Sequence, residues 1–360
     1  MKAAVCRTFN APLTIEDVEV RAPAAGEILV ATKACAICHS DIHFMEGAWP
    51  SELPAVYGHE ASGIIEAVGE GVRNMKVGDH VVVTLIRWCG ACHSCSRGKQ
   101  TVCETTFPLS ESSPLTNGAG ETIEHGLGTG AFAEKILVEQ SQAVVISDEI
   151  AFDVAALLAC GVITGFGAVT NTAAIEAGSN VVVIGTGGVG LNAVQGARHA
   201  GANRIIALDI EEEKLEAAIA FGATDAINAT ANDVSKRVRA LTGGRKADYV
   251  FVTVGAPAAF DQAFRFLGRA GTVVLVGMTE QGVSAKYDPG TMAFMEQNII
   301  GSKMGSARIQ LDIPMLIDLY RQGRLKLDEL ITRRYPLTQI NEAIADVKEG
   351  SALRNVIMFD

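Results

Sequence analysis

The chain has 360 residues, of which 48% are hydrophobic and 20% charged, an ordinary composition for a soluble globular protein with two domains. Its formal net charge of -11 disfavours nucleic acid and anionic membranes as partners, since both require a basic protein surface. The sequence shows no signal-peptide pattern and no uninterrupted apolar run of the roughly 18 residues that span a membrane, so we expect a cytoplasmic protein.

In a reducing compartment, the eight cysteines are expected to be metal ligands or small buried residues rather than disulfides. The first 33 residues read as short strands with turns between them, because MKAAVCRTF, LTIEDVEV and GEILVATKA show no helical period. Cys6 and Cys35 have no partner at a metal-binding spacing, and we interpret both as buried packing residues.

Candidate metal ligands occur in the next two segments, ACAICHSDIHF and LPAVYGHEASG. Cys38 and His59 supply the sulfur and nitrogen donors that zinc prefers. Ser40 and His43 follow Cys38 closely enough to suggest a proton path from a buried site to the surface. Any one of these histidines alone is more simply a hydrogen-bonded surface or core residue, but their combination with Gly-His-Glu favours a functional site.

The segment WCGACHSCSRGKQTVC carries four cysteines at a C-x2-C-x2-C-x7-C spacing: Cys89, Cys92, Cys95 and Cys103. Four thiolates this close in sequence can enclose one tetrahedral zinc ion and leave no open position. An iron–sulfur cluster is the alternative, but a ferredoxin run places its fourth cysteine after three residues and follows it with proline. We therefore predict a structural zinc site in a lobe at residues 87–104, whose metal stabilises the lobe without entering the chemistry.

Residues 104–130 are polar and rich in turn formers, and we expect a long loop that is functional or disordered. The chain then returns to a strand at GAFAEKILV and continues into a helix-compatible stretch, FDVAALLACGVITGFGAVTNTA. Cys160 lies in this stretch, and its apolar surroundings alone would make it a core residue.

A glycine-rich turn follows the apolar run NVVVI at residues 180–184. Gly185 suits the tight turn, Gly187 allows the backbone to approach a pyrophosphate, and Gly190 permits close packing of helix on strand. Gly188 and Val189 complete the turn, where free N–H groups at the helix N-terminus face the phosphates. A turn that only packs well is the simpler alternative, but the strand before it and the helix after it favour dinucleotide binding.

Asp209 ends the next apolar run, 19 residues after Gly190. A carboxylate there accepts hydrogen bonds from the adenosine ribose and repels a 2′-phosphate, which favours NAD over NADP. Helical and strand patterns then alternate as far as TVVLVGM, which indicates a parallel sheet with right-handed crossovers.

The motifs CHSDIH, GHEASGIIEAVGEGV, VGDHVV, the four-cysteine segment and GTGGVG resemble those of the zinc-dependent medium-chain alcohol dehydrogenases, in the same order over essentially the whole chain. The resemblance implies an α/β protein: a GroES-like, mostly β catalytic domain split between both chain ends, with a doubly wound Rossmann domain inserted. We place the catalytic domain at residues 1–161 and 301–360 and the NAD-binding domain at 162–300.

The same resemblance implies two zinc ions per subunit and assigns roles to individual residues. Cys38, His59 and Cys160 are implied as ligands of the catalytic zinc, the ligand set given for alcohol dehydrogenase as a general example. Asp41 is implied to orient His59, and Glu60 to lie behind the metal.

Cofactor and substrate positions are also implied by the resemblance. His39 and Arg354 match positions that meet the pyrophosphate. Lys214 matches a position that contacts the adenosine ribose, although an exposed lysine on a helix is an equal alternative. The pocket residues match or neighbour family positions and are Trp49, Leu85, Phe107 and Phe132.

The expected reaction is hydride transfer from a primary alcohol to NAD, with zinc as Lewis acid and with Ser40 and His43 carrying the proton away. The apolar pocket favours an aromatic, allylic or longer aliphatic alcohol. Alternatives are a thiol-dependent formaldehyde dehydrogenase, a non-catalytic relative and a zinc-binding interaction module. The family forms closed homo-oligomers through the nucleotide domains; we expect a homodimer, with a homotetramer as the alternative.

Overall fold

A computed structural model describes residues 1–350 and 352–360. The chain divides into two compact units. The split unit comprises Met1–Cys160, Arg308–Arg321 and Lys326–Asp360, and the inserted unit comprises Gly161–Ala307 and Gln322–Leu325. The strand Asn298–Gly301, which contains residue 300, pairs with the sheet of the inserted unit.

The split unit is built on a closed barrel and a second sheet. The barrel has the strand order β1 (Lys2–Cys6), β2 (Thr14–Val20), β7 (Leu115–Asn117), β8 (Thr122–His125) and β4 (Ala55–Val56). The second sheet has the order β10 (Ala143–Val145), β6 (His80–Val83), β5 (Glu60–Val68), β3 (Glu27–Ala36), β18 (Arg354–Met358) and β17 (Ile331–Pro336), and β9 (Lys135–Glu139) also pairs with β3. The strands predicted in the first 36 residues are confirmed.

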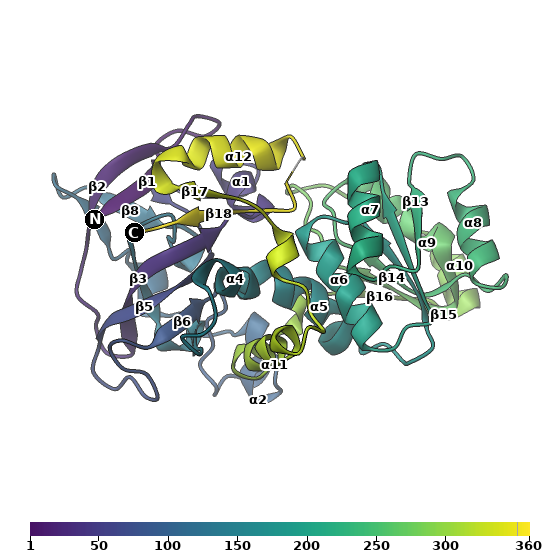
Figure 1. Cartoon of the computed structure of the whole chain (residues 1–360), viewed down its shortest axis with the longest axis horizontal. Helices are drawn as coiled ribbons and strands as arrows, with labels where there is room; N and C mark the ends of the chain where they lie inside the picture. The colour runs from purple at the N-terminus through teal and green to yellow at the C-terminus, as the bar shows by residue number, and fades with distance from the viewer. Residues whose placement is uncertain (351) are drawn as a thin grey trace. The chain divides into compact units, whose positions relative to one another are not determined.

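The two ends of the chain meet in this second sheet. Strand β18 pairs antiparallel with β3, where Ile357 lies opposite Cys35, and parallel with β17. Figure 1 shows the purple N-terminal and yellow C-terminal strands in one unit. The predicted split of the catalytic domain between both chain ends is therefore confirmed, because β18 could not complete the sheet from a separate domain.

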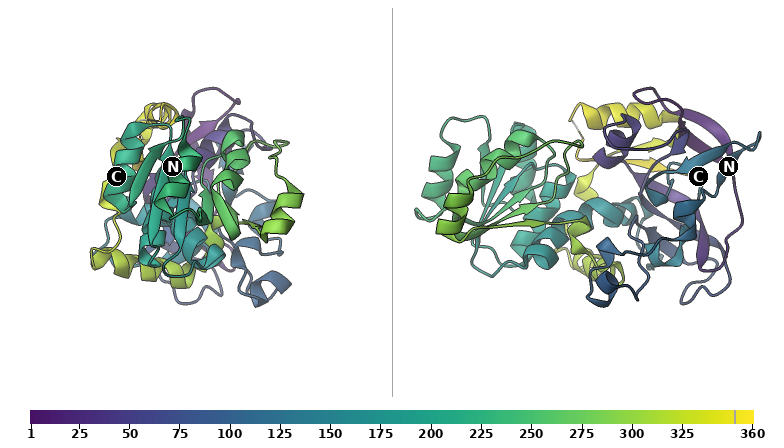
Figure 2. Two further views of the ribbon diagram at one scale, coloured as in Figure 1. Left: turned by 90° about the vertical axis from the view of Figure 1, so that its right-hand side faces the viewer. Right: turned by 180° about the vertical axis from the view of Figure 1, so that it is seen from behind.

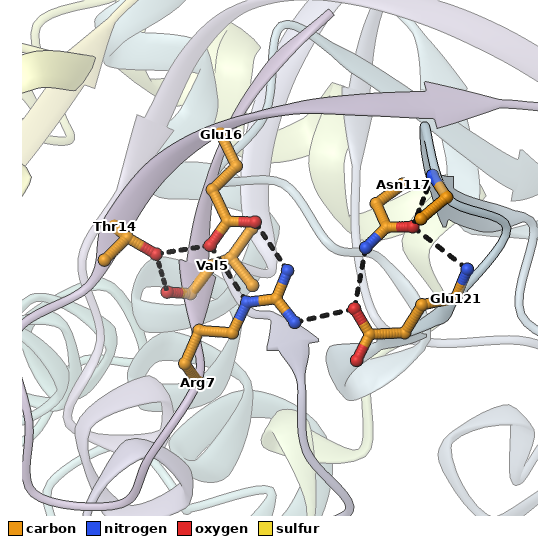
Figure 3. Close-up of polar contacts among 7 residues, drawn as sticks. Val5, Arg7, Thr14, Glu16, Asn117 and Glu121 are labelled. Carbon is orange, nitrogen blue, oxygen red and sulfur yellow. Dashed lines mark hydrogen bonds and ion pairs between the residues drawn. The ribbon is translucent and has the colours of Figure 1, made fainter.

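Residues 104–130 do not form the single long loop expected from their composition. They contain the short helix α3 (Pro108–Glu111) and the hairpin of β7 and β8, which closes the barrel. Arg7 holds the hairpin at the surface: it pairs with Glu16 at 2.6 Å and with Glu121 at 2.8 Å (Figure 3). The polar composition reflects exposed hairpin residues, which sequence patterns do not distinguish from a loop.

The helices of the split unit are mostly short and cover the ends of the strands. They are α1 (His39–Met45), α2 (His93–Ser96), α3, α4 (Phe152–Leu157), α11 (Ile309–Arg321) and α12 (Ile340–Lys348), with 3-10 turns at Gln100–Val102, Gly126–Gly128, Gln140–Gln142, Asp328–Leu330 and Leu337–Gln339. The core beneath them is aliphatic, with Tyr57 and Phe132 as its largest aromatic members.

The inserted unit is a parallel six-stranded sheet. Its strand order is β13 (Asp225–Asn228), β12 (Arg204–Asp209), β11 (Asn180–Ile184), β14 (Ala247–Val252), β15 (Leu267–Leu275) and β16 (Asn298–Gly301). Its helices are α5 (Ile163–Gly167), α6 (Gly188–His199), α7 (Glu212–Phe221), α8 (Val234–Leu241), α9 (Pro257–Phe266) and α10 (Pro289–Met295), and the 3-10 turn Met304–Ser306 follows. Figure 2 shows helices on both faces of the sheet. The strand order reverses between β11 and β14, which is where doubly wound sheets bind nucleotides.

One helical stretch, Phe152–Ala173, is long and apolar enough to cross a membrane by length and composition, with a mean hydropathy of 1.9. It comprises α4, α5 and two π-helical turns, Leu158–Val162 and Ala168–Ala173. Of its most apolar window, 94% is buried within the protein. Helices that are apolar on all sides also form the cores of large proteins, so this stretch is weak evidence for a membrane span.

Candidate active site and metal centres

A buried cluster of metal-binding side chains lies in the split unit. One donor atom each from Cys38, His59, Glu60 and Cys160 lies within 4.8 Å of the others, and all four residues are buried. Cys38 caps the N-terminus of α1, and His59 and Glu60 lie at the start of β5. Cys160 lies in the π-helical turn Leu158–Val162, a geometry that is frequent at functional sites.

The carboxylate of Asp41 organises this cluster. Its Oδ2 accepts a hydrogen bond from the backbone N–H of Cys38 at 3.1 Å. Its Oδ1 accepts from the backbone N–H of Gly58 and lies 2.9 Å from Nδ1 of His59. This contact fixes the imidazole with its proton on Nδ1, which leaves Nε2 as the ligand atom.

Nε2 of His59 is buried and has no hydrogen-bond partner among residues 1–350 and 352–360. A buried nitrogen without a partner is costly, and a metal ion would satisfy it. Two sulfurs and one imidazole nitrogen are the donor set of a catalytic zinc site that keeps a fourth position open. The residues therefore fit the implied metal.

The pKa values of the four residues in the buried cluster shift in different directions. A hydrogen bond with Cys160 holds the pKa of Cys38 well below its usual range, and the same contact raises the pKa of Cys160. Burial alone would lower the pKa of His59, but Asp41 and then Cys38 raise it. Burial raises the pKa of Glu60 to about 7, despite the cationic group beside it.

That cationic group is Arg354, whose Nη2 donates to Oε2 of Glu60. Both side chains are buried, and Arg354 reaches the site from the first residue of β18. The sequence resemblance assigned Arg354 to a cofactor pyrophosphate, whereas here its guanidinium pairs with Glu60. A partner 294 residues away in the chain carries no sequence signal.

The second cluster is the predicted four-cysteine lobe. The sulfurs of its four cysteines also lie within 4.8 Å of one another. Cys92 caps α2 and accepts from the N–H of Cys95 at 3.4 Å, and Cys89 accepts from the N–H of Cys92 at 3.3 Å. A hydrogen bond from Thr105, with backbone N–H groups, lowers the pKa of Cys89 to about 6. Four sulfurs with N–H donors fit a closed structural zinc site.

The two predicted relay residues lie one helical turn apart on α1. Residues three apart share a helix face, so Ser40 and His43 are neighbours. The ring of His43 lies 4.9 Å from that of Trp49, and its Nδ1 has no hydrogen-bond partner within the described part of the chain. His39, at the first position of α1, is exposed.

Three of the four predicted pocket residues are partly accessible: Trp49, Leu85 and Phe107 are half-buried. Phe132 differs from these three, because its side chain is 0% exposed and belongs to the core of the split unit. Its backbone N–H donates to Tyr57 and its carbonyl accepts from Ala4, which hold it in the interior. An aromatic residue near a matched family position does not reveal which way its side chain points.

The glycine turn lies at the carboxyl end of β11. Gly185 has φ +88°, a left-handed conformation that favours glycine. A Cβ on Gly190 would lie 1.9 Å from the carbonyl oxygen of Gly185, so only glycine fits there. At Gly187 a Cβ would meet nothing within 4 Å, which leaves space for a phosphate at the N-terminus of α6. Gly188 and Val189 form the first turn of this helix.

Asp209 is held against this turn by Thr186, a residue that the sequence reasoning missed. Its Oδ2 accepts from the N–H of Thr186 at 2.6 Å and from its hydroxyl at 3.1 Å. The hydroxyl also lies 3.2 Å from the carbonyl oxygen of Lys214. Thr186 is the second residue of GTGGVG, a position that the glycine fingerprint leaves unspecified.

Comparison with known proteins decides the family. A model described as alcohol dehydrogenase GroES-like domain matches residues 24–148, and one described as zinc-binding dehydrogenase matches residues 188–322. An NDMA-dependent alcohol dehydrogenase from Amycolatopsis methanolica is 37% identical over 99% of this chain and 98% of its own. The chain belongs to the zinc-dependent medium-chain alcohol dehydrogenases. As a member of this family it is an oxidoreductase acting on CH–OH groups.

Two further relatives of this alcohol dehydrogenase differ in the substrates that their names state. The crystal structure of benzyl alcohol dehydrogenase from Acinetobacter calcoaceticus has a TM-score of 0.93 and 32% identity, covering 100% of this chain and 99% of that one. A probable S-(hydroxymethyl)glutathione dehydrogenase from Schizosaccharomyces pombe is 36% identical over 99% of this chain and 96% of its own. The predicted GroES-like and Rossmann architecture is confirmed.

Proposed function

We propose that this protein oxidises a primary alcohol, aromatic, allylic or longer aliphatic, to the aldehyde by reversible hydride transfer to NAD. The observation that carries the proposal is the buried cluster of Cys38, His59 and Cys160, in which Nε2 of His59 lacks a partner within the described chain. Zinc held by these three residues supplies a Lewis acid that lowers the pKa of the alcohol.

The surrounding side chains hold and move protons. Asp41 keeps the His59 proton on Nδ1, so that Nε2 faces the cluster. Ser40 accepts the alcohol proton and passes it to His43 one turn along α1, and His43 releases it to solvent. Glu60 and Arg354 neutralise each other beside the two sulfurs, which limits the charge buried at this site.

We infer that NAD is preferred to NADP. The support is the carboxylate of Asp209, which lies against the glycine turn through its bonds to Thr186. A 2′-phosphate on the ribose would bring two negative charges to this carboxylate, whereas a 2′-hydroxyl can donate a hydrogen bond to it. His39, Lys214 and Arg354 remain proposed cofactor contacts.

The substrate proposal rests on apolar side chains and on a relative. Trp49, Leu85 and Phe107 are half-buried aromatic or aliphatic groups, and the likeness to benzyl alcohol dehydrogenase supports an aromatic substrate. The second candidate is oxidation of an S-hydroxymethyl thiol adduct, supported by the 36% identical relative. Against a glutathione adduct stand Gly47 and Trp49, where acidic anchors are expected, and the presence of His43.

We also propose a cytoplasmic homodimer that forms through the inserted units. Support comes from β16, which is an edge strand of its sheet, and from α10 beside it in the sequence, where no residue is buried. Phe294 is 77% exposed and Met278 is 61% exposed, a high exposure for apolar side chains. Light scattering of the wild type and of Phe294→Ser tests this: a dimer weakened by the substitution is expected, and a wild-type monomer contradicts it.

Initial rates of NADH formation across a substrate panel test the proposed reaction. The panel contains ethanol, hexanol, benzyl alcohol and cinnamyl alcohol, each with NAD or NADP, and formaldehyde with or without a low-molecular-weight thiol. Fastest turnover of the bulky alcohols with NAD is the expected result. Reaction with formaldehyde and thiol alone would favour the second candidate, and no reaction with either cofactor would contradict the proposed chemistry.

A further inference from the structure

The guanidinium of Arg87 joins three segments of the split unit. Its Nε donates to Oε1 of Gln142 at 2.8 Å, its Nη1 to Oγ of Ser110 at 2.7 Å, and its Nη2 to the carbonyl oxygen of Gly128 at 2.8 Å. All three acceptors are neutral oxygens. The planar guanidinium uses three separate nitrogens for these three bonds, an arrangement that the single ammonium nitrogen of lysine cannot reproduce.

A half-buried cation without an anionic acceptor is costly to retain. Burial lowers the pKa of Arg87, which shows that its charge is partly removed from water. The carboxylates of Glu139 and Glu27 oppose the effect of burial on the pKa of Arg87 and so help to retain its charge, while the three hydrogen bonds fix the direction of its guanidinium. The cation therefore fixes the geometry of its three partners.

One partner is a strained turn. Leu127, Gly128 and Gly130 have φ values of 56°, 64° and 58°, all left-handed, which is unfavourable for a leucine. A Cβ on Gly128 would lie 2.3 Å from Nη2 of Arg87. Gln142, itself held by Arg87, donates from Nε2 to the same Gly128 carbonyl at 3.0 Å. The conformation of this turn thus depends on Arg87 and Gln142 together.

The same turn, residues 126–130, also contacts the segment that contains His59, a proposed metal ligand. The hydroxyl of Thr129 donates to the carbonyl oxygen of Gly58 at 2.9 Å, and the N–H of Ala131 donates to that oxygen at 2.9 Å. The N–H of Gly58 donates to Asp41, the carboxylate that orients His59. A displacement of the turn would therefore be transmitted to His59 through one peptide unit.

The third partner, Ser110, lies in α3, and Phe107 is the N-cap residue immediately before this helix, whose carbonyl oxygen accepts from the N–H of Ser110 at 2.8 Å. Arg87 also follows Leu85 by two residues in the chain, so two of the three half-buried pocket candidates, Leu85 and Phe107, adjoin either Arg87 or the helix it contacts. A bond from Arg87 to α3 holds the start of that helix relative to the segment after β6, in which Leu85 lies.

We propose that Arg87 is a positioning residue, which sets both the orientation of His59 through the turn 126–130 and the placement of Phe107 through α3. The inference depends on the proposed function, because it assigns His59 to the metal and Phe107 to substrate discrimination. Arg87 acts through these groups and contacts no reacting atom.

Arg87→Lys tests the proposal, because lysine keeps the charge but loses the fork. Two readouts are needed on the full-length, metal-loaded protein: the ratio of kcat/KM for benzyl alcohol and ethanol, and the cadmium NMR spectrum after metal replacement. Loss of hydrogen bonds to a charged group is expected to change the ratio by about 10-fold. It should also shift or broaden the cadmium resonance of the buried site, in which His59 supplies a nitrogen ligand.

Arg7→Lys is the matched control. Arg7 holds the β7–β8 hairpin from the surface through Glu16 and Glu121 (Figure 3), so its loss affects the same segment without reaching Gly128. Neither readout should change in this variant. A purely structural role for Arg87 would lower the melting temperature of Arg87→Lys but leave the ratio and the resonance as in the wild type, and that result overturns the proposal.

Two further variants preserve the test if Arg87→Lys does not fold. Ser110→Ala removes only the link to α3 and should change the substrate ratio. Thr129→Val removes the hydroxyl bond to Gly58, keeps the bond from the N–H of Ala131, and should shift the cadmium resonance. Wild-type behaviour of both variants overturns the proposal. If the wild type oxidises no alcohol, the proposed function fails, while the cadmium spectra still decide whether Arg87 positions His59.

Discussion

The two cysteine clusters of this protein are assembled in opposite ways. The lobe cluster takes all its sulfurs from residues 89–103, and three of its four cysteines are half-buried. The buried cluster takes Cys38, His59 and Cys160 from three distant segments, and every member is buried. A local cluster can form whenever its loop folds around the metal, whereas the buried cluster requires the finished sheet and helix.

This difference assigns a different role to each cluster: the lobe cluster contributes to stability and the buried cluster to catalysis. The lobe has four sulfurs and no open position, so its metal can only hold the loop together. The buried site has three donors of the catalytic type and an oriented imidazole, and the proposed proton path leads from it. We therefore expect substitutions in the buried cluster to remove activity and substitutions in the lobe to remove stability.

The largest expected effect is that of Cys160→Ala. Removal of one of three ligands should release the metal of the buried site and lower the rate of benzyl alcohol oxidation by at least about 1000-fold, since Lewis-acid stabilisation contributes several kcal/mol. Zinc analysis should show one metal ion per subunit instead of two. Near-normal activity with one zinc lost would assign the chemistry to the other cluster.

Asp41→Asn sharpens the comparison by leaving all ligands in place. The amide cannot accept from Cys38, Gly58 and His59 as the carboxylate does, so His59 loses its orientation. Zinc affinity of the buried site should fall by about 10- to 100-fold, measured by competition with a chelator. Asp17→Asn is the control, because Asp17 is an exposed carboxylate paired with Lys2. Equal zinc affinities in the two variants would show that Asp41 does not orient a zinc ligand.

The relay predicts unequal losses on α1. Ser40→Ala should lower kcat by about 100-fold, the range of a positioned proton-transfer group, because alanine has no hydroxyl to carry the proton. His43→Ala should cost much less, since water can replace the outer member of the path. Steady-state rates at saturating NAD and alcohol measure both, and equal losses would contradict the order of the relay.

The smallest effect on activity is expected for Cys103→Ser in the lobe. A weakened four-sulfur site should lower the melting temperature by about 5 °C or more. The kcat of the folded fraction should stay within a few-fold of the wild type. Differential scanning calorimetry and rates at 25 °C measure the two quantities, and a large loss of kcat without a loss of stability would make the lobe catalytic.

Features built from one continuous segment could be predicted from the sequence, whereas features that depend on distant contacts could not. The spacing of Cys89 to Cys103 and the glycine turn from Gly185 to Gly190 were predicted from residues alone, because each is one continuous segment. Cys160 was assigned only through the family resemblance, since its partners lie more than 100 residues away.

The misses share a physical cause. The strands β7 and β8 escaped prediction because a two-stranded hairpin with an exposed face has the polar composition of a loop. The complete burial of Phe132 was not foreseen because sequence gives no side-chain direction. Arg87 and Thr186 were overlooked because their partners come from other segments, and a single arginine or threonine carries no pattern.

The most direct test of the account is the rate of NAD reduction with benzyl alcohol before metal removal, after removal by a chelator, and after return of Zn²⁺, with metal content measured at each step. The account predicts that activity disappears with the zinc and returns with it, while the untreated protein holds two zinc ions per subunit. Undiminished activity in protein that contains no zinc would contradict it.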